Sequence, residues 1–545
     1  MIKKILLGDE AIIHGALESG VSFVSGYPGC PSAEIGDEFL KIAKDMGVYA
    51  EWSTNEKVAL EAAIGASFSG LKSLVNMKSF GINVCSDSLL PLAYTGTKAG
   101  MVIIVADDPS GWSSAQSEQD SRGYAYLSHI PMLEPADPQE AKDFTKLGYE
   151  ISEKFNIPVI LRITTRVAHQ RAPVNIEDKK PSIKQIGEFI SDSHQFVTMP
   201  PRVLEMKKEL LEKIKKVREF ADKSEANKIS KGKDMKELGI IVSGVSYFHF
   251  LEAQKELGLD LSALKLGFFY PLPEDKIKSF IKPLKKVLII EELNGYIEKD
   301  VKVIAKDVNP NLEVFGKNTL SEIGEFNVEK ILSALSKITG KKTEIEKSKQ
   351  LDLPRRTARL CEGCPYWHVF PTLKRIAPKG TVFGGDIGCY MIAGLPPHNM
   401  QDYLFSMGAG TGISHGVKKS TKQKVISLIG DATFFHAGIP AIINTVYNKS
   451  NPLIIVLDNR ITAMTGHQVN PGMGKNLMGE DSEMLEIEDI VKACGVKNVK
   501  VIDQGNPGEL EKAVKEFLEK DEVSVIVCRR ICALLAKRQS VDQHE

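Results

Sequence analysis

The chain has 545 residues, too many for one hydrophobic core, and this length favours three to four domains. Lys and Arg together number 70 and so do Asp and Glu, which argues against nucleic-acid binding and attraction to anionic lipid. No 18 apolar residues follow one another, and Asp9 and Glu10 interrupt the first apolar stretch where a signal peptide would continue. We therefore expect a soluble cytoplasmic protein that acts on small molecules.

The first loop of interest lies in residues 21–34, VSFVSGYPGCPSAE. A short apolar strand is followed by a loop rich in Gly and Pro, and Ser32 stands where it could cap the next helix. In a parallel sheet such a loop lies at the carboxyl end of a strand, where ligands bind. The pattern predicts one wall of a ligand crevice.

The next segment, residues 51–70, reads EWSTNEKVALEAAIGASFSG and predicts a helix that begins after Asn55. Its sequence is rich in small residues, which allow another backbone to approach closely and so predict burial in an interface. These positions are Val58, Ala59, Ala62, Ala63 and Ala66. Glu56 then has two interpretations: an acid favoured by the helix dipole, or a functional carboxylate at the start of a buried helix.

Strands and helices continue to alternate through residue 178, which predicts a doubly wound α/β domain over 1–178. The segment after Val105, ADDPSGWSSAQSEQD, is long, polar and rich in Gly and Ser, as active-site loops often are. Trp112 in this loop could line a site or simply pack against its neighbours.

Four further regions complete the predicted organisation. Residues 179–235 are rich in interleaved Lys and Glu and predict an exposed helix and linker, whereas 236–340 contain three strand–helix units of a smaller α/β domain. A second linker at 341–360 leads into the last domain, 361–545.

Within the last domain, residues 424–466 predict one parallel crossover unit. Apolar strands at 425–429 and 453–457 flank a helix over about 436–447, with Ile439, Ile442, Ile443 and Val446 at helical spacing. Asp431 and Asn459 each follow a strand. Their side-chain oxygens and the Ile461 carbonyl could hold one Mg²⁺, a cation that keeps few protein ligands and bridges to phosphates.

Six of the eight cysteines lie at or after Cys361, which indicates that the last domain uses thiolates. Cys361 and Cys364 form a CxxC, and Cys389 follows in GDIGCYM. Four thiolates would suit zinc or a [4Fe-4S] cluster, and reduced thiols without metal are a third interpretation. For the fourth ligand we favour Cys532, which falls in a turn, over Cys528, which ends a strand, with Cys494 as a weaker choice.

These segments together resemble the thiamine-binding large subunits of the indolepyruvate ferredoxin oxidoreductase family, within the 2-oxoacid:ferredoxin oxidoreductase superfamily, over nearly the whole chain. YPGCPSAE is similar to the superfamily's Tyr-Pro-x-Thr-Pro-Ser motif, and NEKVALEAAIGAS to the segment with the glutamate that activates the cofactor. LCEGCP with Cys389 resembles the ligands of the proximal cluster, and GDATFFHAG with LDNRITAMTGHQ resembles the diphosphate and Mg²⁺ site.

The resemblance implies two doubly wound thiamine-diphosphate-binding domains, of pyrimidine type (1–178) and diphosphate type (361–545), with a transketolase C-terminal-like domain (236–340) between them. It implies that Glu56 is catalytic and hydrogen-bonds the aminopyrimidine, and that Asp431, Asn459 and the Ile461 carbonyl hold Mg²⁺. It implies one [4Fe-4S] cluster at Cys361, Cys364 and Cys389, for which we take Cys532 as the fourth ligand, with Cys528 still possible. The remaining implied cofactor contacts are Tyr27, Pro28, Gly430, Ala432 and Thr433.

The implied reaction is the oxidative decarboxylation of a 2-oxo acid, such as an aryl pyruvate, to acyl-coenzyme A and CO₂, with electrons passed to ferredoxin. A smaller β subunit that helps to bind coenzyme A, and a dimer of heterodimers, are further implications. Two alternatives stay open at this stage: a non-oxidative thiamine-dependent decarboxylase, which would need no cluster, and a pseudoenzyme subunit.

Three features of the sequence depart from the family pattern. Cys30 stands where Thr is usual, and a thiol donates a weaker hydrogen bond. Ala432 replaces the usual Gly after Asp431. The chain ends at Glu545 without the ferredoxin-like domain of typical large subunits, so we expect electrons to leave from the single cluster to an external ferredoxin or to a partner's clusters.

Overall fold

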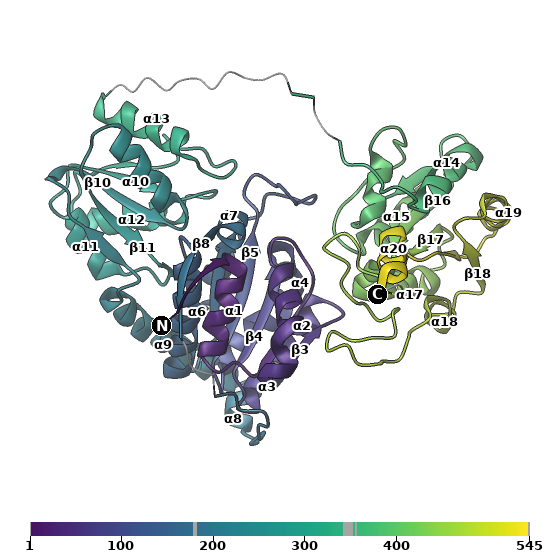
Figure 1. Ribbon diagram of the computed structural model, residues 1–545, viewed down its shortest axis with the longest axis horizontal. Helices are drawn as coiled ribbons and strands as arrows, with labels where there is room; N and C mark the ends of the chain where they lie inside the picture. The colour runs from purple at the N-terminus through teal and green to yellow at the C-terminus, as the bar shows by residue number, and fades with distance from the viewer. Residues whose placement is uncertain (1, 178–181, 342–352, 355–356, 543–545) are drawn as a thin grey trace. The chain divides into compact units, whose positions relative to one another are not determined.

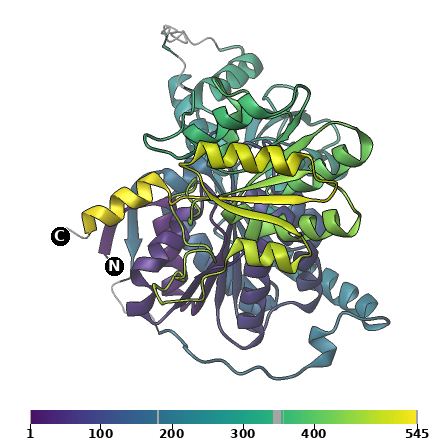
Figure 2. The same cartoon turned by 90° about the vertical axis from the view of Figure 1, so that its right-hand side faces the viewer.

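The computed structural model describes residues 2–177, 182–341, 353–354 and 357–542 and divides into two compact units, Met1–Gln350 and Leu351–Glu545. Both units are built from mainly parallel sheets with helices, as Figures 1 and 2 show, and this confirms the predicted α/β class. The predicted linker at 341–360 falls largely outside the described residues.

The first unit contains a seven-stranded sheet in the order β12-β6-β7-β5-β4-β2-β3, parallel except for β12, which pairs with β6 in the antiparallel sense. Its strands are β2 (Phe23–Gly26), β3 (Tyr49–Trp52), β4 (Ser73–Lys78), β5 (Met101–Asp107), β6 (Met132–Leu133), β7 (Val159–Thr164) and β12 (Phe268–Tyr270). Its helices are α1 (Gly8–Glu18), α2 (Ala33–Met46), α3 (Glu56–Phe68), α4 (Ser79–Thr95), α5 (Gly123–Ser128), α6 (Pro138–Phe155) and α7 (Thr165–His169). A separate ribbon pairs β1 (Ile2–Leu7) with β8 (Arg171–Ile176).

The same unit contains a second sheet, in the order β14-β13-β10-β11-β9. Its strands are β9 (Lys228–Ser230), β10 (Asp234–Ser243), β11 (Leu261–Leu266), β13 (Lys286–Ile290) and β14 (Glu313–Phe315). The helices around it are α10 (Ser246–Glu256), α11 (Glu274–Ile281), α12 (Tyr296–Val308) and α13 (Val328–Thr339). One hydrophobic core continues from β4 and β5 into β11 and β13, so the two sheets are packed together.

Between β8 and β9 in the chain come α8 (Ser193–Phe196) and α9 (Arg202–Lys223). The helix expected from the Lys- and Glu-rich segment is α9, but it is not exposed on all sides. Its buried face includes Met206, Leu210 and Val217, and α9 packs against α4. The interleaved charges indicated an exposed helix because they occupy the opposite face of this amphipathic helix.

The second unit has one parallel sheet, in the order β15-β16-β17-β19-β18. Its strands are β15 (Val382–Gly384), β16 (Val425–Gly430), β17 (Leu453–Asp458), β18 (Asn498–Asp503) and β19 (Ser524–Arg529). Its helices are α14 (Tyr366–Ile376), α15 (Ala409–Ser420), α16 (Asp431–Thr433), α17 (Ile439–Tyr447), α18 (Ile487–Ala493), α19 (Pro507–Leu518) and α20 (Ala533–Asp542), with a 3₁₀ turn at Cys389–Gly394 and a π turn at Phe434–Gly438.

Strand β17 shows why this sheet is covered on both faces. Leu453, Ile455 and Leu457 point into a core with α14 and α19, whereas Ile454 and Val456 point into a second core with α17 and α18. Successive side chains of a strand point to opposite faces, so an uninterrupted apolar strand needs helices on both sides. The predicted crossover unit is confirmed: β16 and β17 are parallel neighbours joined through α17.

Several local expectations differ from the structure. Ser32 is the N-cap of α2, but its hydroxyl donates to the Gly29 carbonyl and makes no capping bond. Val58 and Ile443 carry exposed side chains on otherwise well-packed helices. Helical spacing predicts which face of a helix is buried, and Val58 and Ile443 lie at the edge of that face, where side chains meet solvent.

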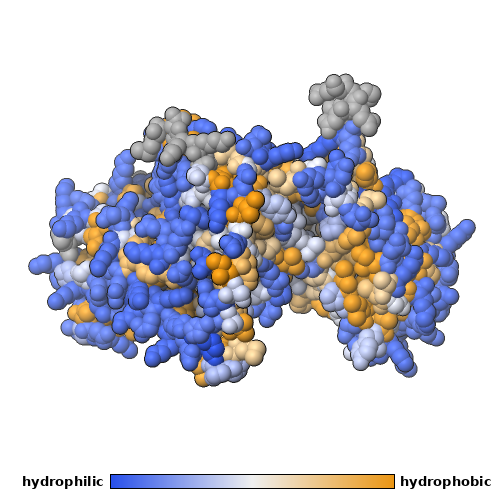
Figure 3. All heavy atoms as spheres, turned by 90° about the horizontal axis from the view of Figure 1, so that it is seen from below, coloured by the Kyte–Doolittle hydropathy of each residue, from blue (hydrophilic) through white to orange (hydrophobic). Residues whose placement is uncertain are grey.

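Hydrophilic side chains dominate the face drawn in Figure 3, with hydrophobic side chains in separate patches among them. Within the described ranges, no helix combines the length and apolar character needed to cross a membrane.

A buried ion cluster around Arg122 joins the two sheets of the first unit. The Arg122 guanidinium lies 2.8 Å from Asp120 and 3.1 Å from Glu291, a residue that follows β13, and it donates to the carbonyls of Glu292 and Asn294. Burial would raise the pKa of Asp120, but the charge of Arg122 outweighs it and lowers that pKa to about 2. Arg122 is therefore the main partner that keeps the buried Asp120 carboxylate charged.

We predict that Arg122→Met destabilises the first unit by about 3–5 kcal/mol, because Asp120 and Glu291 would stay buried without their partner. Calorimetric unfolding of the full chain measures this. Arg218→Met, which removes a half-exposed ion pair with Glu274, should cost less than about 1 kcal/mol. Equal losses in the two variants would contradict the role given to Arg122.

Candidate functional site

The loop predicted as a crevice wall follows β2 in the first unit and contains Tyr27, Pro28 and Cys30. Tyr27 is buried, and its backbone N–H donates to the Asn76 carbonyl of the adjacent strand β4 at 3.3 Å. Cys30 is half-buried, and burial raises the pKa of its thiol. The thiol is therefore protonated at neutral pH and can offer only a weak hydrogen bond.

Glu56 is the first residue of α3, and its side chain is buried. The cap of the helix is Asn55, whose side-chain oxygen accepts from the Val58 N–H at 2.9 Å, so Glu56 is not needed as the cap. The start of α4 lies directly against it: a Cβ atom at Gly81 would come within 2.5 Å of the Glu56 Cγ. Glycine at position 81 therefore leaves room for the carboxylate.

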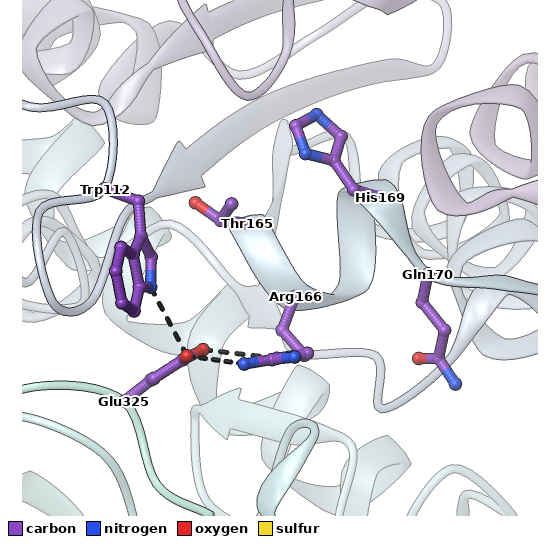
Figure 4. Close-up of a pocket in the computed structure, with 6 residues that line it drawn as sticks. All are labelled: Trp112, Thr165, Arg166, His169, Gln170 and Glu325. Atoms are coloured by element: carbon purple, nitrogen blue, oxygen red, sulfur yellow. Dashed lines mark hydrogen bonds and ion pairs between the residues drawn. The ribbon is translucent and has the colours of Figure 1, made fainter. Parts of the chain in front are cut away.

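The long loop after β5 lines a cavity of about 400 Å³ together with residues from α7 and the segment before α13. Figure 4 shows its lining residues, with Glu325 between Trp112 and Arg166. The Trp112 indole N–H donates to Glu325 at 3.3 Å, and Arg166 forms an ion pair with the same carboxylate at 2.5 Å. Trp112 is 70% exposed, so it lines this cavity and is not part of a core. A volume of this size suits a small-molecule ligand.

In the second unit, the structure brings Asp431, Asn459 and Ile461 together. The Ile461 N–H lies 3.0 Å from Asp431 Oδ2 and 3.1 Å from Asn459 Oδ1, so both side-chain oxygens converge on one atom. All three residues are buried. Burial, together with the nearby charge of Asp458, raises the pKa of Asp431 to about 7. A buried acid and amide of this kind are oxygen donors that suit Mg²⁺.

The other predicted contacts of this loop have mostly structural partners. A Cβ atom at Gly430 would approach the Tyr390 ring to 2.7 Å, so glycine is required there by packing. The Thr433 hydroxyl donates to the Ile387 carbonyl at 2.9 Å. Ala432 lies in the single helical turn α16, a conformation that alanine adopts without strain.

The predicted cluster ligands Cys361, Cys364, Cys389 and Cys532 all line one cavity of about 90 Å³. Burial, reinforced by neighbouring thiols, raises the pKa of Cys364 to about 11 and that of Cys389 to about 12. Cys528 is instead fully buried in the core beneath β19, and Cys494 packs in the core on the other face of the sheet. The turn after β19 therefore brings Cys532, and not Cys528, to the cavity.

The spacing of these sulfurs bears on which metal would suit them. Four thiolates at about 2.3 Å from a tetrahedral zinc would lie within about 4 Å of one another. Among the described residues, the only three potential metal ligands that lie within 4.8 Å of one another are Asp9, Glu34 and His169, and no cysteine is among them. No three of the four thiols therefore lie close enough in this structure to hold one zinc ion together.

Sequence reasoning missed three residues at these sites. The Asn470 side chain donates to Asp431 Oδ2 at 3.1 Å, the Tyr366 hydroxyl accepts from the Asn459 side chain at 3.3 Å, and His467 Nε2 lies 3.7 Å from the Cys532 sulfur. Asn470 and His467 come from a long segment without regular periodicity, which offered no signal. Tyr366 directly follows the CxxC segment and could have been noticed there.

The chain matches two protein families. Residues 14–231 match the family described as pyruvate flavodoxin/ferredoxin oxidoreductase, thiamine diphosphate-binding, and residues 386–528 match the C-terminal thiamine pyrophosphate-binding domain of thiamine pyrophosphate enzymes. A 2-oxoglutarate:ferredoxin oxidoreductase from Magnetococcus marinus shares the fold, with a TM-score of 0.51 and 17% identity over 62% of this chain and 65% of that one.

Relatives with higher identity extend over nearly the whole chain. The indolepyruvate oxidoreductase subunit IorA of Methanothermobacter thermautotrophicus is 43% identical over 98% of this chain and 87% of its own length. The subunit IorA of Pyrococcus horikoshii is 41% identical over 98% of this chain and 86% of its own length. The 2-oxoglutarate synthase subunit KorA of Methanocaldococcus jannaschii is 27% identical over 56% of this chain and 92% of its own.

The two matched domains and these relatives define a thiamine-diphosphate-dependent oxidoreductase that acts on 2-oxo acids by oxidative decarboxylation. Within that class, the chain belongs to the indolepyruvate oxidoreductase subunit IorA family.

Proposed function

We propose that the chain is the catalytic subunit of an enzyme that converts an aryl pyruvate and coenzyme A into an acyl-coenzyme A and CO₂, and passes the electrons through one [4Fe-4S] cluster to ferredoxin. A smaller β subunit would complete the coenzyme A site, in a dimer of heterodimers in the cytoplasm. The observation that carries this proposal is the shared cavity of Cys361, Cys364, Cys389 and Cys532, which Asn459 of the Asp431 site also lines. A non-oxidative decarboxylase would have no use for four thiols beside its cofactor site.

Thiamine diphosphate, when bound, would supply the nucleophilic carbon that the reaction of a 2-oxo acid requires. Asp431, Asn459 and the Ile461 carbonyl would hold the Mg²⁺ that neutralises its diphosphate. Their fit rests on the convergence of two buried oxygens, and a dication would stabilise an Asp431 carboxylate that burial alone disfavours. Tyr27 and Pro28 would form part of the pyrimidine wall.

Glu56 would hydrogen-bond the pyrimidine nitrogen N1′ and so promote removal of the C2 proton by the neighbouring exocyclic nitrogen. Its burial supports this role, because a hydrogen bond between charged groups is stronger where water is excluded. The role also fits the local structure, because Asn55 caps the helix and the Glu56 carboxylate is not needed for capping.

An iron–sulfur cluster at the four cysteines would accept electrons one at a time. Asn459 supports electron transfer from the cofactor site, because its backbone carbonyl accepts from the Cys532 N–H at 3.2 Å while its side chain belongs to the Mg²⁺ site. Asn459 therefore connects the proposed Mg²⁺ site to the proposed cluster site.

The first prediction from this proposed function concerns Mg²⁺. Asp431→Ala should weaken Mg²⁺-dependent thiamine diphosphate binding by about 100-fold or more while the fold survives, because a metal ligand is lost at the end of β16 and no apolar core contact is removed. Calorimetric titration with the cofactor measures the affinity. Asp503→Ala, at an exposed ion pair with Arg530, is the matched control and should bind normally. Unchanged affinity in Asp431→Ala would remove the Mg²⁺ assignment.

The second prediction tests the chemistry itself. Glu56→Gln should keep cofactor affinity but slow exchange of the C2 proton by about 10²–10⁴-fold, because a neutral amide cannot stabilise the charged pyrimidine equally. NMR of the bound cofactor follows the exchange, and phenylpyruvate-dependent reduction of a viologen dye should fall in parallel. Glu61→Gln changes an exposed residue of the same helix and should exchange at the wild-type rate. Equal rates for Glu56→Gln would leave Glu56 with a structural role only.

The third prediction separates the two candidate fourth ligands. Cys532→Ser should lose the visible absorbance and part of the iron of the anaerobically purified chain, because only Cys532 of the two reaches the cavity. Cys528→Ser replaces a thiol buried in the core and should keep the iron. Iron analysis and electron paramagnetic resonance measure the outcome. One equivalent of zinc without iron in the wild-type chain would defeat the electron-transfer part of the proposal.

A further inference from the structure

Lys78 is a buried cation at the edge of the sheet where the first unit presents Glu56 and the Cys30 loop. It is the last residue of β4, between β2 and β5, and its side chain is only 11% exposed. Lysine is rarely buried to this extent unless it is paired, because removing its charge from water is costly. Its position at the carboxyl end of a central parallel strand is where ligands bind in such sheets.

The hydrogen bonds of Lys78 hold the ammonium group without neutralising it. Its Nζ donates to the carbonyls of Cys30 at 2.7 Å and Ser113 at 2.9 Å, which use two of its three N–H groups. The nearest carboxylate, Asp108, lies 4.0 Å away, beyond hydrogen-bond distance.

Asp108 is itself already satisfied by other donors. It accepts from the Ser113 N–H and the Ser114 hydroxyl at 2.7 Å each, and from the Thr165 hydroxyl at 2.6 Å. The next carboxylate along the chain, Asp107, is paired with Arg162 at 2.7 Å. These donors are neutral, so Asp108 keeps its charge and forms a long ion pair with Lys78, whose ammonium group keeps one N–H for a further acceptor.

Packing fixes Lys78 relative to the proposed catalytic group. A Cβ atom at Gly29 would come within 2.7 Å of the Lys78 Cβ, so the Cys30 loop lies directly on the lysine stem. Lys78 is also the N-cap residue of α4, and Gly81 in the first turn of that helix touches Glu56. The start of α4 therefore positions both Lys78 and Glu56.

We propose that Lys78 binds the carboxylate of the 2-oxo acid and so determines the preference of the enzyme for an acid over the corresponding aldehyde. This inference rests on the proposed function. The carboxylate leaves as CO₂, so an excessively strong clamp would stabilise the ground state and slow the reaction. A single ammonium group is a point charge and holds a carboxylate less rigidly than the bidentate fork of an arginine.

The cavity beside this site provides room for the rest of the substrate. Trp112 directly precedes Ser113, and Thr165 donates to Asp108, so residues next to both partners of Lys78 line the cavity of about 400 Å³ in Figure 4. The alternative is that Lys78 only ties the Cys30 loop to the loop after β5. The two roles make different predictions for substrates that lack a carboxylate.

The test compares phenylpyruvate with phenylacetaldehyde in the complete enzyme, loaded with thiamine diphosphate and Mg²⁺ and combined with its smaller subunit. The acid anion and coenzyme A give acyl-coenzyme A, CO₂, one proton and two electrons. The aldehyde and coenzyme A give the same acyl-coenzyme A, two protons and two electrons. A viologen dye accepts the electrons in both reactions, so only the carboxylate differs.

Lys78→Met should lower kcat/KM for phenylpyruvate by about 10- to 100-fold, the value of a hydrogen bond to a charged group, and change that for the aldehyde by less than about 3-fold. Lys78→Arg should recover part of the activity with the acid. Lys142→Met, which removes another buried lysine 2.8 Å from Glu18, is the matched control and should leave the ratio of the two substrates unchanged. Equal losses with acid and aldehyde in Lys78→Met would overturn the inference and leave Lys78 as a loop anchor.

A binding measurement decides the question without turnover. Calorimetric titration of the same enzyme with 3-phenylpropionate and with 3-phenylpropanamide should show that the wild type prefers the carboxylate and that Lys78→Met loses this preference. A preference that persists in Lys78→Met would also overturn the inference. If the wild-type enzyme reduces the dye with neither substrate, the proposed function fails, and the titration still tests Lys78.

Discussion

Asn459 is the residue on which the arrangement of the second unit depends. Its side-chain oxygen accepts from the Ile461 N–H, its amide group donates to the Tyr366 hydroxyl, and its backbone carbonyl accepts from the Cys532 N–H. These three partners lie in the loop after β17, in α14 next to the CxxC, and in the turn after β19. One buried residue therefore joins segments that lie 166 residues apart in the chain, from Tyr366 to Cys532, and it contacts both the proposed metal site and the proposed cluster site.

Both candidate sites share the same electrostatic condition. Burial raises the pKa of Asp431 to about 7 and the pKa of Cys389 to about 12, so at neutral pH Asp431 is only partly ionised and Cys389 is protonated. A metal centre reverses this, because its positive charge stabilises the carboxylate or the thiolate and displaces the proton. Loading of cofactor and cluster should therefore be coupled to proton release. In both sites burial disfavours the charged form of a side chain, and a bound metal centre would favour it.

Much of this organisation could be predicted from the sequence because it depends on short-range patterns. Apolar runs that end in polar residues identify β16 and β17, and parallel strands then bring Asp431 and Asn459 to one edge. Cys532 was separable from Cys528 because the strand ends between them. By contrast, Asn470 reaches Asp431 through a long irregular segment, and α9 hides an apolar face among its charges, so only tertiary packing shows their roles.

The short strand β12 has a consequence for motion. Phe268 and Tyr270 belong to the stretch expected to form a separate small domain, yet they pair with β6 and extend the large sheet of the first unit. Backbone hydrogen bonds across a shared sheet, a continuous core and the Arg122 cluster leave no hinge between the two parts. A domain swing within this unit would break all three at once. Conformational change during turnover must instead come from its loops, above all the exposed segment around Trp112, whose link to Glu325 can open without disturbing a strand.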